Sequence, residues 1–272
     1  MNFYIEIENA LLSDDIDVKA SITHRLLAYC SENEVRAEDG FVPKPLVRPS
    51  FADRCRIVSP RELPARKDFD TPEGLATLVH AVAHIEYSAI DLALDAVYRF
   101  PQMPDAYRRD WLEVAADEIR HFGMLQEILG TLGFAYGDLP VHQGLFDAAQ
   151  HTAHSVLDRM AVIPRFYEAT GLDVNPQIIK KLQAKQHFAP VKCVMKALDV
   201  IYEEEIVHVH KGDRWFKYLC AQKGLDEQET YFGILERYGL LKKHRPHINV
   251  NARKEAGFAC EEILKLGAKQ CE

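Results

Sequence analysis

Hydrophobic positions in this chain recur mainly three and four residues apart, the spacing that places side chains on one face of an α-helix. Alternating apolar and polar runs, which would indicate strands, are nearly absent. The pattern predicts long helices over about residues 17–33, 70–99, 105–129, 146–170, 190–223, 226–238 and 251–266. The predicted fold class is therefore all-α.

Capping and breaking residues mark the expected helix boundaries. The run Asp70-Thr71-Pro72-Glu73 combines a capping residue, a proline at the first helical position and an acid in the first turn, which together predict a helix start. Gly171 is expected to end the helix that begins near residue 146, and Asn175-Pro176 to begin a short one. Pro164 lies inside that earlier helix and is expected to kink it, because proline removes a backbone hydrogen bond.

The same pattern divides the chain into three parts. Residues 1–69 hold an N-terminal helix and a Pro-rich, basic segment over about 41–70. Residues 70–223 are predicted to form a four-helix bundle, and residues 224–272 a helical extension packed on it. The Pro-rich segment either lies across the main domain or is a solvated linker, since its prolines exclude a helix.

Four glutamates interrupt the apolar faces of four predicted helices, and two of them begin a Glu-x-x-His motif. Buried carboxylates cost several kcal/mol each unless they are paired or bound to metal. Two divalent cations would neutralise four such charges, and carboxylate with imidazole suits iron or manganese. A single metal ion and a metal-free, salt-bridged core are the alternatives. The predicted ligands are Glu86, Glu118, His121, Glu168, Glu205 and His208.

Acidic residues also precede each Glu-x-x-His motif. Asp117 and Glu204 are expected to accept the distal N–H of a ligand histidine, which fixes its tautomer, and Arg120 to pair with one of them. Tyr87 and Tyr202 lie close to ligand glutamates in the sequence. They are candidates for a substrate pocket or for core packing. Arg165 is a candidate either for such a pocket or for securing the end of its helix.

Several short motifs resemble those of a bacterial ferritin-like family known as domain of unknown function 455. They are His84-Ile-Glu86, Asp117-Glu118-x-Arg120-His121-Phe122, Pro164-Arg165-x-x-Glu168-Ala and Gly171-Leu-Asp173-Val-Asn175-Pro176. The helix spacing also resembles the ferritin-like superfamily of di-iron carboxylate proteins. The resemblance covers about residues 70–223 and implies a ferritin-like bundle with the six metal ligands, but no particular reaction. A more distant resemblance is to the di-iron hydroxylase that modifies a prenylated adenosine in tRNA.

The expected function is oxidation of a small organic substrate by dioxygen at two iron ions, with manganese or a mixed pair as alternatives. Such an oxidoreductase needs an electron donor, so a reductase protein is an expected partner. Peroxide scavenging, iron oxidation in metal handling, and a metal-stabilised scaffold without activity are the competing functions. The long segments flanking the bundle favour an enzyme, because they are suited to shaping a substrate pocket.

Composition adds few constraints. The chain has 47% hydrophobic and 27% charged residues, as is ordinary for a globular protein. A net charge of -8 argues against broad nucleic-acid binding, so tRNA remains a partner only by analogy and through the basic segment. Neither a membrane span nor a signal peptide is visible. Six scattered cysteines are expected to be free thiols in the cytoplasm, and a homodimer is expected.

Overall fold

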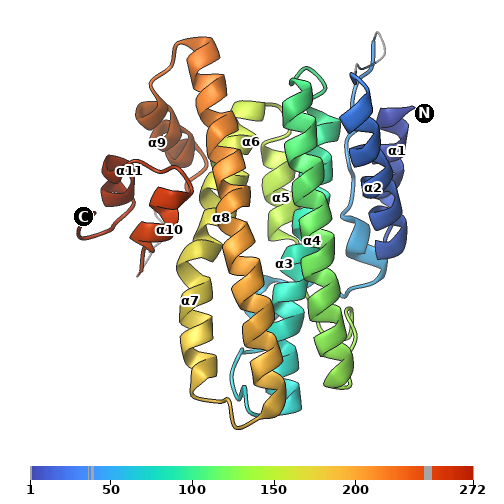
Figure 1. Cartoon of the computed structure of the whole chain (residues 1–272), viewed down its shortest axis with the longest axis vertical. Helices are drawn as coiled ribbons and strands as arrows, with labels where there is room; N and C mark the ends of the chain where they lie inside the picture. Colours follow the sequence, from blue (N-terminus) through green and yellow to red (C-terminus); the bar gives the residue numbers. More distant parts are fainter. Residues whose placement is uncertain (1, 36, 38–39, 242–246, 272) are drawn as a thin grey trace. The chain divides into compact units, whose positions relative to one another are not determined.

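The computed structural model describes residues 2–35, 37, 40–241 and 247–271. Throughout that part of the chain the regular elements are helical, apart from one isolated parallel bridge between Ile57 and Val141, which confirms the all-α prediction (Figure 1). The helices are α1 (Phe3–Leu12), α2 (Ile16–Glu32), α3 (Pro72–Arg99), α4 (Asp105–Thr131), α5 (Gly144–His151), α6 (Val156–Val162), the π-helical η3 (Ile163–Glu168), α7 (Ala169–Gln183), α8 (Ala189–Lys223), α9 (Glu227–Arg237), α10 (Val250–Glu255) and α11 (Cys260–Lys265), with short 3-10 turns η1 (Ser50–Asp53) and η2 (Pro60–Glu62).

The chain forms two compact units. The first unit comprises Met1–Gln150 and Lys185–Ala197, and the second comprises His151–Ala184 and Leu198–Glu272. Helix α8 therefore contributes its first turns to one unit and the rest to the other. The predicted division at residues 69 and 223 is not tested by this and stays a prediction.

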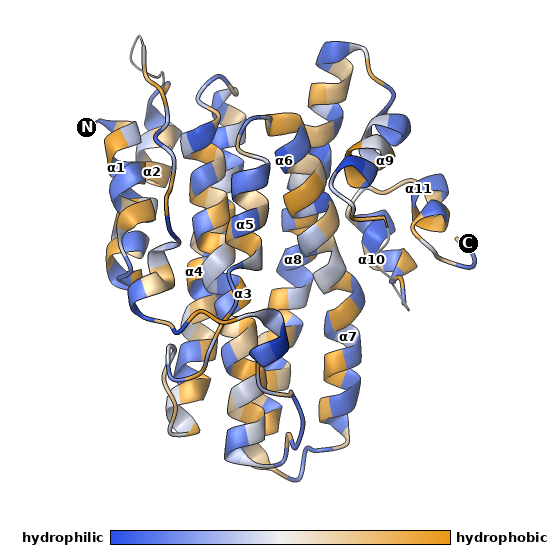
Figure 2. Ribbon diagram, turned by 180° about the vertical axis from the view of Figure 1, so that it is seen from behind, coloured by the Kyte–Doolittle hydropathy of each residue, from blue (hydrophilic) through white to orange (hydrophobic). Residues whose placement is uncertain are grey.

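Helices α3 and α4 form the centre of the first unit and lie side by side (Figure 1). The predicted start of α3 is confirmed: Pro72 is its first residue, and the Thr71 hydroxyl accepts a hydrogen bond from the Gly74 N–H at 3.1 Å. Apolar and polar residues are interspersed along these helices (Figure 2), and α3 is buried along most of its length. This burial positions Glu86 away from solvent.

Helices α1 and α2 and the extended segment that follows them pack in the first unit. The sequence did not predict α1. The buried Lys19 ammonium lies 2.5 Å from Asp91 of α3 and donates to the Ala10 carbonyl at 2.8 Å. The Lys44 N–H donates to the Tyr98 hydroxyl at 3.1 Å, so the Pro-rich segment contacts α3 at this point, while many of its residues are exposed.

In the second unit, a continuous helical run replaces the predicted helix 146–170. That prediction was wrong at both ends, because the chain breaks after His151 and the helix continues through Gly171 to Gln183. The break is stabilised by Ser155, whose hydroxyl accepts the Asp158 N–H at 3.2 Å. Asn175-Pro176 starts no new helix. The Asn175 amide instead donates to the Leu198 carbonyl at 3.1 Å, so the proline is tolerated inside α7.

The predicted distortion at Pro164 is confirmed and takes the form of the π-helical segment η3. A π turn places one extra residue in the helix and commonly occurs near functional sites. Gly212 of α8 gives the proline ring its space, since a Cβ atom there would lie 2.2 Å from the Pro164 Cβ. This close contact fixes the distorted turn against α8.

The end of the chain differs from two further predictions. The helix expected over 251–266 is divided into α10 and α11 by Gly257, whose φ is +101°. Cys260 and Cys271 form a disulfide, so the prediction of free thiols was wrong for this pair. Free thiols remain at Cys30, Cys55, Cys193 and Cys220. Among the described residues, no helix is both long enough and apolar enough to span a membrane.

Candidate metal centre

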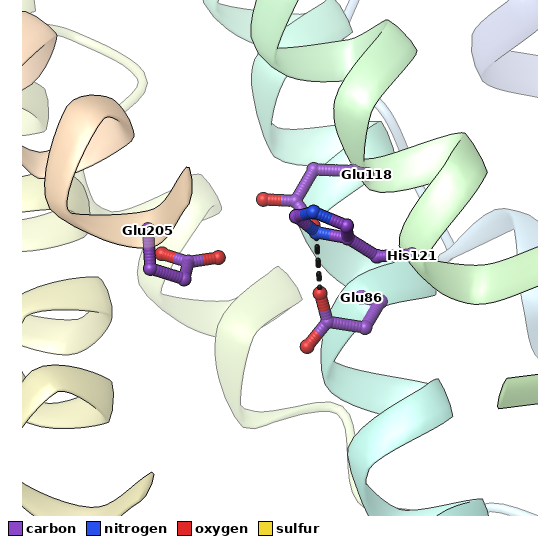
Figure 3. Close-up of side chains that lie close together, drawn as sticks. All are labelled: Glu86, Glu118, His121 and Glu205. Atoms are coloured by element: carbon purple, nitrogen blue, oxygen red, sulfur yellow. Dashed lines mark hydrogen bonds and ion pairs between the residues drawn. The ribbon is translucent and has the colours of Figure 1, made fainter. Parts of the chain in front are cut away.

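Glu86 of α3 and the Glu118–His121 pair of α4 come together inside the first unit (Figure 3). Glu118 and His121 are three residues apart, so they share one face of α4. The His121 Nδ1 lies 3.2 Å from the Glu86 Oε2 and 3.2 Å from the Glu118 Oε2. Each side chain can offer one ligand atom, and these atoms lie within 4.8 Å of one another.

Burial controls the charge of this group. Glu86 is 3% exposed, and Glu118 and His121 are fully buried. Burial, together with the neighbouring Glu118 charge, raises the pKa of Glu86 to about 8, although His121 opposes the shift. Burial would lower the pKa of His121, but its hydrogen bonds with Glu118 and Glu86 outweigh this and raise that pKa to about 11. The two shifts together show that the group gathers protons to balance buried negative charge.

A divalent cation could replace those protons. Two carboxylates and an imidazole form a mixed oxygen and nitrogen donor set, which suits iron, manganese or zinc. The three side chains are buried and their ligand atoms lie close together. The negative charge of the two carboxylates is balanced only when the group takes up protons or a cation. It could therefore hold a metal ion.

The second unit carries the other predicted ligands (Figure 3 labels Glu205). In the second Glu-x-x-His motif, His208 is fully buried and its Nδ1 lies 3.6 Å from the Glu205 Oε1. The Glu205 Oε2 is buried and has no hydrogen-bond partner in the described part of the chain. Glu168 is the last residue of η3, so the π-helical turn sets the backbone position of this glutamate. A buried carboxylate oxygen without a hydrogen-bond partner is available to bind a metal ion.

Of the predicted neighbours of the ligands, Asp117 and Glu204 are half-buried and Arg120 is exposed. Asp117 and Arg120 form the expected ion pair at 3.1 Å, with side chains 38% and 45% exposed. The predicted hydrogen bonds of Asp117 and Glu204 to ligand histidines stay predictions.

The three candidate pocket residues have structural contacts. Tyr87 is buried and donates to the Asp14 carbonyl at 3.1 Å. The Tyr202 hydroxyl accepts from the Asn249 amide at 2.7 Å. Arg165 is fully buried, with its guanidinium 2.9 Å from Asp213 and 2.7 Å from Glu262. These contacts favour packing and helix anchoring, and a substrate role for the three stays a prediction.

Sequence reasoning assigned no role to Tyr136, which completes an aromatic cluster beside the ligands. Its ring stacks on Tyr87 at 5.3 Å between centroids and meets the edge of Phe122 at 5.0 Å. Tyr87 follows Glu86 and Phe122 follows His121 in the sequence, so these rings adjoin two ligand positions. Tyr136 lies in a loop between Gly133 and Gly137, outside every helical stripe, and only that flanking glycine pattern could have indicated a fixed position.

The family model described as "Protein of unknown function (DUF455)" matches residues 12–264. The chain belongs to this family. A protein of Haemophilus influenzae described as "Uncharacterized protein" is 39% identical over 221 residues, which cover 79% of this chain and 75% of that one. No solved structure matches the chain. The resemblance to domain of unknown function 455 is thus confirmed. The resemblance to the ferritin-like superfamily stays a prediction, and the comparisons assign no reaction.

Proposed function

We propose that this protein is a ferritin-like dinuclear metal protein that uses two iron ions to oxidise a small organic substrate with dioxygen. The observation that carries the proposal is the buried group Glu86, Glu118 and His121, with its convergent ligand atoms and its need for positive charge. The chain carries the same set twice, one glutamate and one Glu-x-x-His motif each time. This repetition is typical of carboxylate-bridged dinuclear proteins.

The charges of the donor set fit two divalent cations. Four carboxylates supply four negative charges, and two neutral imidazoles complete the ligands. Glu168, Glu205 and His208 would hold the second ion, and the unpartnered Glu205 Oε2 is an available donor atom. The ligands are hard to borderline donors, which favours iron or manganese over softer metals.

The chain's own residues would control what reaches the ions. Two reduced iron ions, when bound by these ligands, would supply electrons for the activation of dioxygen. Glu118 and His121 are fully buried, which fixes their rotamers and keeps bulk water from them. Tyr87 and Phe122 cover the adjoining face of α3 and α4 with their rings, 5.3 Å apart. The π turn that ends at Glu168 gives that ligand a backbone distinct from the regular helices around it.

An organic substrate is favoured over simple metal handling by the segments outside the predicted bundle. Within residues 41–70, Lys44 and Ser50 are bonded to side chains of α3, while many other residues of the segment are exposed. These contacts therefore add an ordered segment to the surface of the first unit. Metal storage or peroxide removal needs no such segment.

Single-turnover oxygen consumption tests this function. Protein loaded anaerobically with Fe(II) is mixed with oxygenated buffer, and the oxygen consumed per chain is recorded. The variant Glu118→Ala is expected to lose the reaction, whereas Glu127→Ala, which removes an exposed glutamate from the same helix, is expected to keep it. Oxygen uptake that is equal in the two variants would contradict the proposal. Turnover with peroxide alone, without any need for a reductant, would instead favour peroxide removal.

A further inference from the structure

The first unit contains a cavity of about 340 Å³ that is separate from the metal ligands. It lies between the segment Pro60–Arg66, one face of α3 and the loop Leu139–His142. Two histidines of α3, His80 and His84, reach its wall. At 100° per residue, they lie on a different side of α3 from Glu86.

His80 lines this cavity and keeps one donor that no described residue uses. Its side chain is 1% exposed, and its Nε2 accepts the Gly137 N–H at 2.9 Å. Accepting through Nε2 leaves the proton of the neutral ring on Nδ1. Burial lowers the pKa of His80 to about 4, against the charge of Asp138, so the ring is neutral near pH 7. Its Nδ1–H has no hydrogen-bond partner among the described residues.

His142 presents a second donor by the same logic. Its Nδ1 accepts the Gly144 N–H at 3.1 Å, so the proton of its neutral ring is on Nε2. That Nε2–H is likewise without a partner in the described chain. His84 is fully used, because its Nε2–H donates to the His142 carbonyl at 2.8 Å and its Nδ1 accepts from the Tyr136 hydroxyl at 2.9 Å.

The wall also carries a positive charge and no carboxylate. Arg66 lines the cavity and forms no ion pair with a described acid. Its charge, after burial, lowers the pKa of His142, while Asp147 opposes the shift from outside the cavity wall. The two imidazoles are not suited to binding a metal ion. His80 and His142 each use one ring nitrogen as the acceptor for a backbone N–H and carry the proton on the other, so neither has a free lone pair to offer.

We infer that this cavity binds a small organic anion, whose carboxylate or phosphate accepts from His80 Nδ1–H and His142 Nε2–H and faces Arg66. Donors combined with a cation are the groups that recognise such anions. Apolar side chains also line the cavity, Leu63, Pro64 and Leu139 among them, beside Thr77, so it can take a compact organic body attached to the anion. The volume is in the range of small-ligand pockets. This site does not depend on the metal centre.

The wall is held in place by the backbone. The Val58 N–H donates to the Val141 carbonyl at 2.8 Å, and the Val141 N–H donates to the Arg56 carbonyl at 3.0 Å. Gly137 adopts φ +107° and passes so close to Arg54 that a Cβ atom would lie 2.7 Å from its carbonyl oxygen. The basic, Pro-rich segment is thereby fixed as one side of a binding site.

Isothermal titration calorimetry on the full chain tests this inference with four probes: benzoate, phenyl phosphate, inorganic phosphate and the neutral benzyl alcohol. Benzoate or phenyl phosphate is expected to bind at least about tenfold more tightly than benzyl alcohol. Which of the two binds more tightly identifies the anionic group. Inorganic phosphate tests whether the apolar body is needed.

Matched variants locate the site. Arg66→Ala is expected to weaken binding of the better probe by about tenfold, whereas Arg61→Ala, an exposed arginine of the same segment outside the cavity wall, is expected to leave it unchanged. His142→Asn keeps an acceptor near Gly144 but removes the Nε2–H, and it is expected to weaken binding similarly. Equal loss in both arginine variants would overturn the inference. So would the failure of both organic anions to bind more tightly than benzyl alcohol at up to about 10 mM.

Discussion

Metal binding at Glu86, Glu118 and His121 should release protons, and the structure sets how many. The pKa values of Glu86 and His121 are both raised, so the pair holds protons at pH 7 that an isolated glutamate and imidazole would have lost. Metal ligands must be deprotonated to bind. One divalent cation entering this group at pH 7 should therefore displace about two protons, which leaves the buried charge unchanged.

The pH dependence of affinity follows with a definite sign. Both pKa values are raised, so protons compete with metal across the neutral range and affinity rises with pH. Near pH 6 to 7 the affinity should increase about a hundredfold per pH unit. Between about pH 8 and 11, where only His121 still holds its proton, the increase should fall to about tenfold per unit.

Calorimetry in buffers with different ionisation enthalpies measures the released protons directly. The titration uses a Glu205→Gln/His208→Gln background, so that the first unit supplies the ligands, with Mn²⁺ as the probe. The slope of observed enthalpy against buffer ionisation enthalpy should be about two at pH 7. Adding Glu86→Gln, which resembles the protonated acid, should reduce it to about one. A slope near zero, or an affinity that does not change between pH 6 and 7, would refute the account of this buried group.

Three further predictions concern stability. Arg165→Met should lower the free energy of unfolding by about 3 kcal/mol in urea, because its two carboxylate partners stay buried, and a loss below about 1 kcal/mol would contradict its anchoring role. Gly212→Ala should lower the free energy of unfolding by about 1–3 kcal/mol, because the added methyl group overpacks against Pro164. Gly233→Ala, with open space around it in α9, should raise the free energy of unfolding by up to about 1 kcal/mol. Changes of the same sign in both variants would contradict the close contact between Gly212 and Pro164. Cys271→Ser should lose up to about 3 kcal/mol, and adding reductant should abolish its difference from the wild type, since both would then lack the disulfide.

Helical periodicity predicted that Glu86, Glu118 and His121 would come together. Glu86, Glu118 and His121 interrupt apolar stripes of two successive helices, and helices joined by a short turn pack against each other. Burial of these stripes then brings the three side chains together. The same reasoning about Glu168, Glu205 and His208 stays a prediction for the site as a whole.

Tertiary contacts decide the features that the sequence pattern did not predict. The apolar spacing continues across Ser155, so the sequence pattern does not predict the break at this position. In the structure the Ser155 hydroxyl caps α6 there. Asn175-Pro176 has the form of a helix start, but the asparagine finds a carbonyl partner on α8 and the helix continues. The pairing of Cys260 with Cys271 depends on the turn after α11, which spacing alone does not define.

The anion cavity shows a similar limit. His80 and His142 are 62 positions apart, and each becomes a donor only because a backbone N–H occupies its other nitrogen. Neither the tautomers nor the position of Arg66 follows from residue types. A loop and an extended segment bring them together, and such elements carry no periodic signal.

The metal content of the full chain tests the central claim most directly. Protein reconstituted anaerobically with Fe(II) is desalted and analysed for iron per chain, beside Glu118→Ala and the exposed-site control Glu127→Ala. A dinuclear centre predicts about two iron ions per chain in the wild type and the control, with loss in Glu118→Ala. Less than about 0.2 ion per wild-type chain would contradict the claim and leave Glu86, Glu118 and His121 as a protonated, metal-free core.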